Sequence, residues 1–125
     1  MRLRAILLVL AVLAAACGGG ETTASGPEVL GEQLFNSMVV GGKAGCLSCH
    51  STYPDDDGIG PTLAGMASVA GTRVDGQAAA DYVRRSITDP DAYVVEGFET
   101  GVMPAGWNLS ETQIDSLVEY ILNLK

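Results

Sequence analysis

The chain has 125 residues, a formal net charge of −8 at pH 7 and a hydrophobic fraction of 47%. This length suits one small domain and leaves little room for a second. Fifteen acidic residues stand against seven basic ones, which argues against nucleic-acid binding because such affinity depends on neutralising phosphates.

The first sixteen residues have the layout of an export signal. Arg2 and Arg4 form a short basic start, and an apolar run covers residues 6–16. The run is too short to span a bilayer, which needs about 20 apolar residues. A buried helix of the fold is the alternative, but no polar residue interrupts the run to give it an outer face. We therefore expect residues 1–16 to be a signal peptide and the protein to be exported.

Cys17 ends a stretch, Leu13–Cys17, that resembles the lipobox of bacterial lipoproteins, in which the cysteine becomes the lipidated first residue. The fit is imperfect, because Ala14 stands where such boxes usually have leucine. Residues 17–26 are rich in Gly, Thr and Ser and predict a flexible linker that reaches at most about 35 Å. We expect a lipid anchor on Cys17, with conventional cleavage and a free Cys17 thiol as the alternative. A tethered protein would lie in the periplasm or on the outer face of a bacterial membrane.

The folded domain is expected over residues 27–125, and its first element is a helix. Pro27 is favoured at a first helical position, and Glu28 lies near the positive end of the helix. The helix should run until the pair Gly41–Gly42 stops it. Its inward face should carry the apolar residues at helical spacing: Leu30, Leu34, Phe35 and Met38.

The sequence Cys46-Leu47-Ser48-Cys49-His50 is the C-x-x-C-H pattern of covalent haem attachment. Residues three apart on a helical turn lie on one side of the backbone, so the two thiols can each bond one vinyl group of the haem. The next residue, His50, is then carried beneath the porphyrin plane as an iron ligand. The motif predicts one covalent haem c, bound through Cys46 and Cys49.

Three other interpretations of the motif fit the chain less well. A thioredoxin-type redox pair would need a βαβ context, of which the sequence shows no sign. A structural zinc site needs four ligands, and His50 is the only histidine of the chain. A disulfide between Cys46 and Cys49 would close a strained small loop.

A further helix is predicted from about Gln77 to Thr88, with Asp89-Pro90 ending it. Its inward-facing residues should be Ala79, Tyr82, Val83 and Ile87. Within it, the pair Arg84–Arg85 is interpreted as a solvated face, or as a partner for a haem propionate.

Methionine is the expected second axial ligand, because the chain has no second histidine. Met103 lies in an irregular stretch between glycines and a proline, where a loop held by a ligand bond explains the sequence better than core packing. Met66 is more consistent with packing or with lining of the haem pocket, but it remains the alternative ligand. Met38 is assigned to the core.

The last helix begins at Ser110, where Ser at the N-cap and Gln113 three residues later form a capping box. An apolar stripe follows it: Ile114, Leu117, Val118, Ile121 and Leu124. The fold class is therefore all-α, with three main helices and long loops wrapped around the haem. A domain of this size with few aromatic residues would be marginally stable without the haem.

Taken together, these features resemble the class I, monohaem cytochrome c family over nearly all of residues 28–125. Gly31 and Phe35 match the glycine and aromatic residue of the family's first helix, and Tyr120 matches the aromatic residue that packs across them. Residues 60–65 match its Gly-Pro-x-Leu-x-Gly loop, and residues 102–104 its distal-ligand loop. The resemblance implies the cytochrome c fold.

The resemblance also implies a role for Pro61, whose carbonyl accepts a hydrogen bond from the ring N–H of His50 and so fixes its tautomer. Residues 86–98, which lead into Met103, are similar to the cytochrome domains fused to subunit II of some haem-copper oxidases. The chain departs from those proteins because it lacks a copper-binding cupredoxin portion. It also lacks the lysine-rich face of the mitochondrial carrier.

A carrier of single electrons in a bacterial respiratory chain, not an enzyme, is the function that these features favour. Its partners would be redox proteins, with a quinol-oxidising complex as donor and a terminal oxidase or another protein as acceptor. A haem enzyme or gas sensor with a labile sixth ligand is the alternative, as is a subunit held permanently in a larger complex. The acidic run Asp55–Asp57 is interpreted as a loop rim rather than a cation site, and Trp107 as a residue that packs, lines the haem edge or bonds a propionate.

Overall fold

The computed structural model describes residues 26–125, so the predicted signal peptide and Cys17 lie outside the described residues. The helices are α1 (Pro27–Phe35), α2 (Met66–Val69), α3 (Ala79–Thr88) and α4 (Glu111–Leu122), and short 3-10 helices η1 (Cys46–Ser48), η2 (Ala70–Thr72) and η3 (Pro90–Ala92) lie between them. A two-residue hairpin pairs β1 (Val39–Val40) with β2 (Lys43–Ala44). The all-α class with three main helices is confirmed. Among the described helices, none has the length and apolar character needed to cross a membrane.

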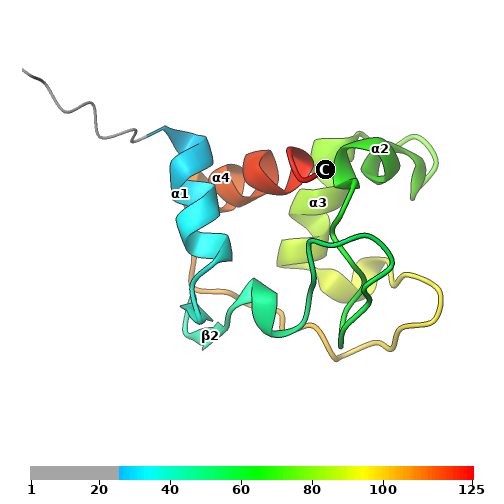
Figure 1. Ribbon diagram of the computed structural model, residues 1–125, viewed down its shortest axis with the longest axis horizontal. Helices are drawn as coiled ribbons and strands as arrows, with labels where there is room; N and C mark the ends of the chain where they lie inside the picture. Colours follow the sequence, from blue (N-terminus) through cyan, green and yellow to red (C-terminus); the bar gives the residue numbers. More distant parts are fainter. Residues whose placement is uncertain (1–25) are drawn as a thin grey trace, which may run out of the picture.

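Helices α1 and α4 cross in direct contact, and this crossing joins the two ends of the domain (Figure 1). Gly31 makes the close approach possible, because a Cβ at this position would overlap the backbone oxygen of Ser116 and lie 2.7 Å from the Cβ of Tyr120. The rings of Phe35 and Tyr120 pack against each other with centroids 5.3 Å apart. The match of these three residues to the family's helix crossing, predicted from the sequence, is confirmed by their contacts.

The predicted extent of the first helix was wrong at its C-terminal end. The helix ends at Phe35, and the side-chain amide of Asn36 donates to the Glu32 carbonyl at 2.9 Å. Met38 therefore lies beyond the helix, immediately before the hairpin, and is 87% exposed rather than part of the core. The helical spacing of the apolar residues wrongly predicted that the helix includes Met38. The polar pair Asn36–Ser37 ends the helix before the chain reaches Gly41.

The two later helices form as the sequence predicts. In α4, the Ser110 hydroxyl accepts from the Gln113 backbone N–H at 3.3 Å, and the Gln113 side chain accepts from the Ser110 N–H at 2.9 Å. Helix α3 starts at Ala79, two residues later than predicted. Arg84 is not part of a purely solvated face, because its guanidinium pairs with Glu111 and Asp115 of α4 and joins the two helices.

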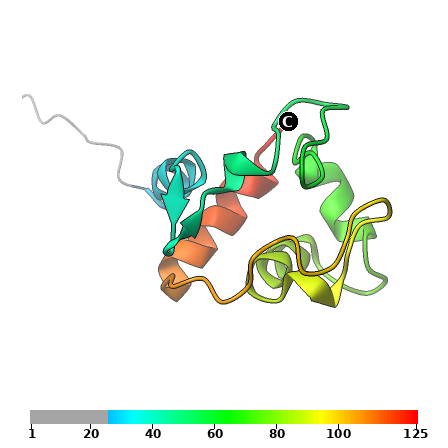
Figure 2. The same cartoon turned by 90° about the horizontal axis from the view of Figure 1, so that it is seen from below.

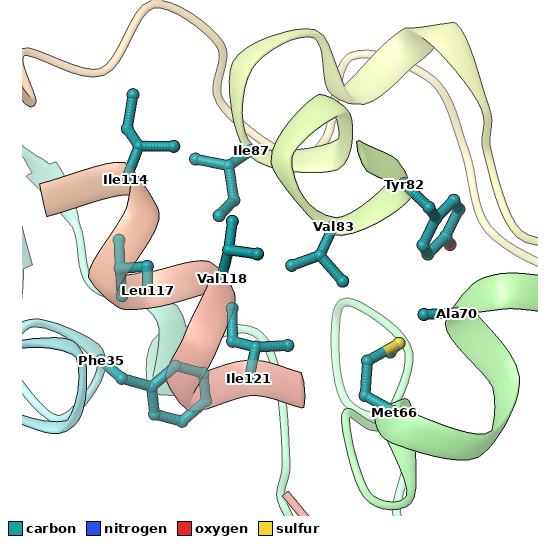
Figure 3. Close-up of a cluster of buried hydrophobic side chains, with 10 residues drawn as sticks. All are labelled: Phe35, Met66, Ala70, Tyr82, Val83, Ile87, Ile114, Leu117, Val118 and Ile121. Atoms are coloured by element: carbon teal, nitrogen blue, oxygen red, sulfur yellow. The ribbon is translucent and has the colours of Figure 1, made fainter. Parts of the chain in front are cut away.

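The buried core lies around α4, which contacts α1, α2 and α3 (Figure 3). The predicted inward faces of α3 and α4 supply most of it, and α1 contributes Phe35. Met66 of α2 is 5% exposed, and its sulfur points toward Ala70. The core residues are Phe35, Met66, Ala70, Tyr82, Val83, Ile87, Ile114, Leu117, Val118 and Ile121.

Two long irregular segments complete the domain and carry the predicted functional residues. The first, residues 46–65, begins with η1 and leads to α2, and we call it the histidine segment. The second, residues 93–109, runs from η3 back to the start of α4, and we call it the methionine loop (Figure 2). Residues of both segments line the cavity that is described below.

Candidate functional site

The predicted helical turn at the C-x-x-C-H motif is present as η1. The Cys46 carbonyl accepts from the backbone N–H groups of Cys49 at 3.1 Å and His50 at 3.0 Å. Cys46 and Cys49 are both half-buried free thiols. Both residues line the same large cavity of the protein, as the spacing of the motif requires for two bonds to one group.

The ionisation of Cys46 argues against a redox-active thiol pair. Burial raises the pKa of the Cys46 thiol, and the nearby Cys49 acts in the same direction. Reactive cysteines of thioredoxin-type pairs have a lowered pKa, because the thiolate is the nucleophile. The environment of Cys46 therefore does not favour disulfide exchange.

The His50 ring is fixed by the loop of the histidine segment that carries Gly60 and Pro61. Its Nδ1 lies 2.7 Å from the Pro61 carbonyl oxygen, the contact expected from the resemblance. Because a carbonyl oxygen only accepts, Nδ1 carries the proton and Nε2 is left as the basic nitrogen. Gly60 packs against the ring, since a Cβ there would lie 2.6 Å from Cε1 of His50. The histidine segment thus presents an oriented imidazole with one nitrogen free to bind a metal.

The loop that carries Pro61 is itself bonded back to the motif. The Gly60 N–H donates to the Cys49 carbonyl at 2.9 Å, and the Leu63 N–H donates to the Ser51 carbonyl at 2.8 Å. The Thr62 hydroxyl donates to the Tyr53 carbonyl at 2.7 Å. These bonds fix the distance between the Pro61 carbonyl and the His50 ring.

The acidic run belongs to the same loop. The Asp56 carboxylate accepts from the Ser51 hydroxyl at 2.7 Å, and the Asp57 carboxylate accepts from the Thr62 N–H at 2.8 Å. Within residues 26–125, no group of three or more acidic, histidine or cysteine side chains is arranged to hold a metal ion. Asp56 and Asp57 therefore stabilise the histidine segment through these hydrogen bonds.

The cavity between the two irregular segments and the core has a volume of about 150 Å³. That is about ten times the space that one water molecule needs. Its wall is mainly apolar and includes residues of the histidine segment, the methionine loop, α3 and α4. Cys46, Cys49, His50, Pro61 and Met103 all line it, so residues predicted from distant parts of the sequence meet at one cavity.

Two methionines line this cavity, and their surroundings differ. Met66 is packed within the core cluster on α2. Met103 lies in the methionine loop, half-buried, with Pro104 after it. Met66 therefore both packs in the core and lines the cavity, and Met103 lines the same cavity.

Two polar atoms in the cavity wall lack a partner among the described residues. Arg73 Nε and Trp107 Nε1 are buried donors without a hydrogen-bond acceptor there, and both residues line the cavity. Buried donors are normally paired, so they indicate a ligand with acceptor groups. The sequence analysis missed Arg73 and named Arg84 and Arg85 instead, neither of which lines the cavity. A single arginine between short helices gives no periodic signal that could have identified it.

The family model for cytochrome c matches residues 29–125 of the chain. The chain belongs to the cytochrome c family. This membership makes the chain a haem-binding protein of an electron-carrying family, and it implies haem c. No curated protein matches the chain.

The residues of the cavity fit a haem. The wall is apolar, as a porphyrin requires, and it holds two thiols at the C-x-x-C spacing and an imidazole with a free nitrogen. The unpaired donors of Arg73 and Trp107 suit the carboxylate groups of haem propionates. Each kind of group on a haem thus has a matching residue in the wall of this cytochrome c domain.

Proposed function

We propose that this protein is a membrane-tethered monohaem c-type cytochrome that transfers single electrons in a bacterial respiratory chain. The observation that carries the proposal is one apolar cavity lined by Cys46, Cys49, His50 and Met103. Bound haem would supply a one-electron couple between Fe(III) and Fe(II). Cys46 and Cys49 would hold it by thioether bonds, which prevent its loss during repeated electron transfer.

His50 and Met103 are the proposed axial ligands. The hydrogen bond from His50 Nδ1 to the Pro61 carbonyl would fix the tautomer in which Nε2 is free to bind the iron. We prefer Met103 to Met66 because Met66 belongs to the buried core cluster on α2, whereas Met103 lies in an irregular loop of the cavity wall. Methionine as the second ligand raises the reduction potential, and we expect a positive value.

Covalent attachment and ligation are tested on protein exported by a host that matures c-type cytochromes. The pigment should stay with the protein in acidified acetone and be lost from a Cys46→Ala, Cys49→Ala variant. Met103→Leu should abolish the weak far-red absorption of ferric haem bound by sulfur, whereas Met66→Leu should retain it. A colourless wild-type protein would contradict haem attachment, and loss of the band only in Met66→Leu would reverse the ligand assignment.

A closed coordination sphere distinguishes an electron carrier from a haem enzyme or gas sensor. With both axial positions held by side chains, the iron has no open position for a substrate. Carbon monoxide added to the reduced wild-type protein should therefore leave the Soret band unchanged on the time scale of mixing. Prompt binding would favour the enzyme or sensor interpretation instead.

The membrane tether rests on the sequence before Pro27, the first residue of α1. Lipidation of Cys17 after removal of residues 1–16 would place the domain at the periplasmic or outer face of the membrane. Radiolabelled palmitate should then enter the protein, and Cys17→Ala should be recovered in the soluble fraction. A wild-type protein that is soluble without detergent would contradict the tether.

The charge of the domain indicates the kind of redox partner. Removal of the signal would leave five basic residues against fifteen acidic ones, which favours partners with a basic docking patch. Ile59 and Val102 line the cavity and are 63% and 45% exposed, so they would supply apolar contact near the haem. The proposed donor is a quinol-oxidising complex and the acceptor a terminal oxidase, in line with the similarity of residues 86–98 to oxidase-fused domains.

Electron-transfer rates with such complexes should fall steeply as salt rises, because steering by opposite charges is screened. A salt-independent rate would contradict the charge argument. Retention of the cytochrome in one complex through detergent purification would instead favour a permanent subunit over a mobile carrier.

A further inference from the structure

The methionine loop is held by few hydrogen bonds. At its start, the Phe98 N–H donates to the Val95 carbonyl at 3.1 Å. The next nine residues, 99–107, form a single hydrogen bond with the described part of the chain. It runs from the Gly101 N–H to the Asp91 carboxylate, with a distance of 2.8 Å to Oδ1. This bond lies two residues before Met103.

Asp91 is presented from a well-fixed turn. It is the central residue of η3, in which Pro90 is buried and the Ala92 N–H donates to the Asp89 carbonyl at 3.0 Å. The turn packs against the end of α3. Asp91 also lines the cavity, so its carboxylate joins the rigid helical part of the protein to the loop that crosses the site.

The conformation of Gly101 suits it to receive this bond. Its φ is +76°, a left-handed backbone conformation that glycine adopts without steric cost. Beyond Met103, the Asn108 N–H donates to the Gly41 carbonyl at 3.3 Å. Met103 therefore lies between two hydrogen bonds that attach the loop to the rest of the domain. The bond to Asp91 is the shorter of the two and is nearer to Met103 in the sequence.

We propose that Asp91 is a positioning residue that holds Met103 at the iron through the Gly101 amide, an inference that rests on the proposed His50/Met103 ligation. A loop released at Gly101 samples more conformations, and the effective concentration of the Met103 sulfur at the iron falls. A charged acceptor makes this hydrogen bond stronger than one between neutral groups. Loss of the carboxylate therefore weakens the ligand bond without touching the ligand.

The test compares Asp91→Ala with Asp91→Asn, which keeps an oxygen acceptor, and with Glu96→Ala. Glu96 is an exposed carboxylate of the same loop, and no hydrogen bond joins its side chain to the described residues, so it is the control for charge removal. Imidazole is titrated into the ferric proteins, where it competes with Met103. We expect about tenfold tighter imidazole binding in Asp91→Ala, as for the loss of one hydrogen bond to a charged group. Asp91→Asn should give a smaller increase, because its neutral oxygen makes a weaker bond, and Glu96→Ala should bind imidazole as wild type does.

A second readout follows the Gly101 amide by hydrogen exchange, which reports the bond itself whatever the iron ligand is. Exchange at Gly101 should be fastest in Asp91→Ala and intermediate between that variant and wild type in Asp91→Asn. The inference is overturned if Asp91→Ala matches wild type in imidazole affinity or in exchange at Gly101. It is also overturned if Glu96→Ala and Asp91→Ala tighten imidazole binding equally, since the effect is then one of charge.

Failure of the proposed ligation would look different. The ferric wild type would then lack the sulfur-to-iron absorption, or Met103→Leu would retain it. A wild type with that absorption and an Asp91→Ala variant with unchanged imidazole affinity would leave the ligation intact and remove only the role of Asp91.

Discussion

The histidine segment and the methionine loop face the same cavity but are held in different ways. The histidine segment is bonded to itself at close intervals, from the η1 turn to the Thr62 and Leu63 contacts. The methionine loop is held by one hydrogen bond to Asp91 before Met103 and by one to Gly41 after it. The imidazole is therefore oriented by the chain itself, whereas we expect the sulfur to depend on the ligand bond for much of its order. Such a division would allow the histidine side to guide haem into place and the methionine side to close over it.

The largest effect on this difference is expected when the haem is removed. A cavity of about 150 Å³ without its contents costs about 4 kcal/mol at the usual rate per unit volume. A small domain is stable by only about 5–15 kcal/mol, so the loss is a large part of the total. The Cys46→Ala, Cys49→Ala variant should therefore melt broadly and at lower temperature.

Hydrogen exchange on that variant then separates the two regions. Amides of the methionine loop should lose protection more completely than those of the histidine segment, whose bonds do not involve the haem. A sharp thermal transition close to that of the holo-protein, or equal loss of protection in both regions, would contradict the comparison.

A smaller change can disturb the histidine segment alone. Gly60→Ala adds a Cβ 2.6 Å from Cε1 and 2.9 Å from Nδ1 of His50, so the ring or the loop must shift. We expect a loss of about 2 kcal/mol, as for other overpacked sites, together with a changed axial-ligand signature in the electron paramagnetic resonance spectrum. The free energy of unfolding is measured by denaturant titration.

Gly71→Ala is the matched control, because its nearest contact would be the Ala79 Cβ at an ordinary 3.8 Å. It should cost little and leave the spectrum unchanged. Equal effects of the two substitutions would mean that the Gly60 backbone does not hold the ring.

The same contrast explains what the sequence could and could not predict. The motif Cys46–His50 is contiguous, and its chemistry fixes the spacing, so the histidine side could be predicted residue by residue. Met103 could be named by elimination, but the residue that holds its loop, Asp91, bonds across ten positions and leaves no periodic pattern. Met38 shows the opposite error, since helical spacing placed it in the core although the chain had already turned after Phe35.

The partners of polar residues far apart in the chain could not be predicted from the sequence either. The role of Arg84 was predicted from the pattern of its own helix, whereas its ion-pair partners lie on α4. Arg73 belongs to no long element, and its buried Nε is recognised only when the cavity is known. Sequence periodicity predicts which faces of α3 and α4 are buried, but it says nothing about which charges meet across the folded domain.

On the methionine side, Trp107→Phe removes a buried donor and keeps the aromatic packing. If Trp107 Nε1 bonds a haem propionate, the variant should lose about 1 kcal/mol of stability. Its reduction potential should also shift with pH differently from wild type, because the carboxylate has lost a donor. Arg73→Met should act in the same direction.

The control for this substitution is Tyr93→Phe, which trims a hydroxyl from the same loop. Tyr93 is 38% exposed, so its hydroxyl can bond to water and its loss should change the potential little. If Trp107→Phe and Arg73→Met both gave the same pH profile as wild type, the buried donors would not be bonding the haem.

The smallest expected effect is a pH dependence that again separates the two regions. Burial raises the pKa of Tyr82 above the ordinary value of 10.0, and its ring packs edge-on against Tyr93 at 5.8 Å, where the methionine loop begins. The folded protein therefore binds this proton more tightly than the unfolded chain does. The stabilisation is complete below the ordinary tyrosine pKa and is lost as pH rises through the raised value.

Alkaline pH should accordingly loosen the methionine loop before the histidine segment. The far-red absorption of the sulfur-bound ferric haem, followed against pH, should disappear at a higher pH in Tyr82→Phe than in wild type. Tyr53→Phe is the control, because Tyr53 is 72% exposed and belongs to the histidine segment. A shift of the same size in both variants would mean that alkaline sensitivity is a property of the whole domain, and the two sides of the cavity would then respond as one unit.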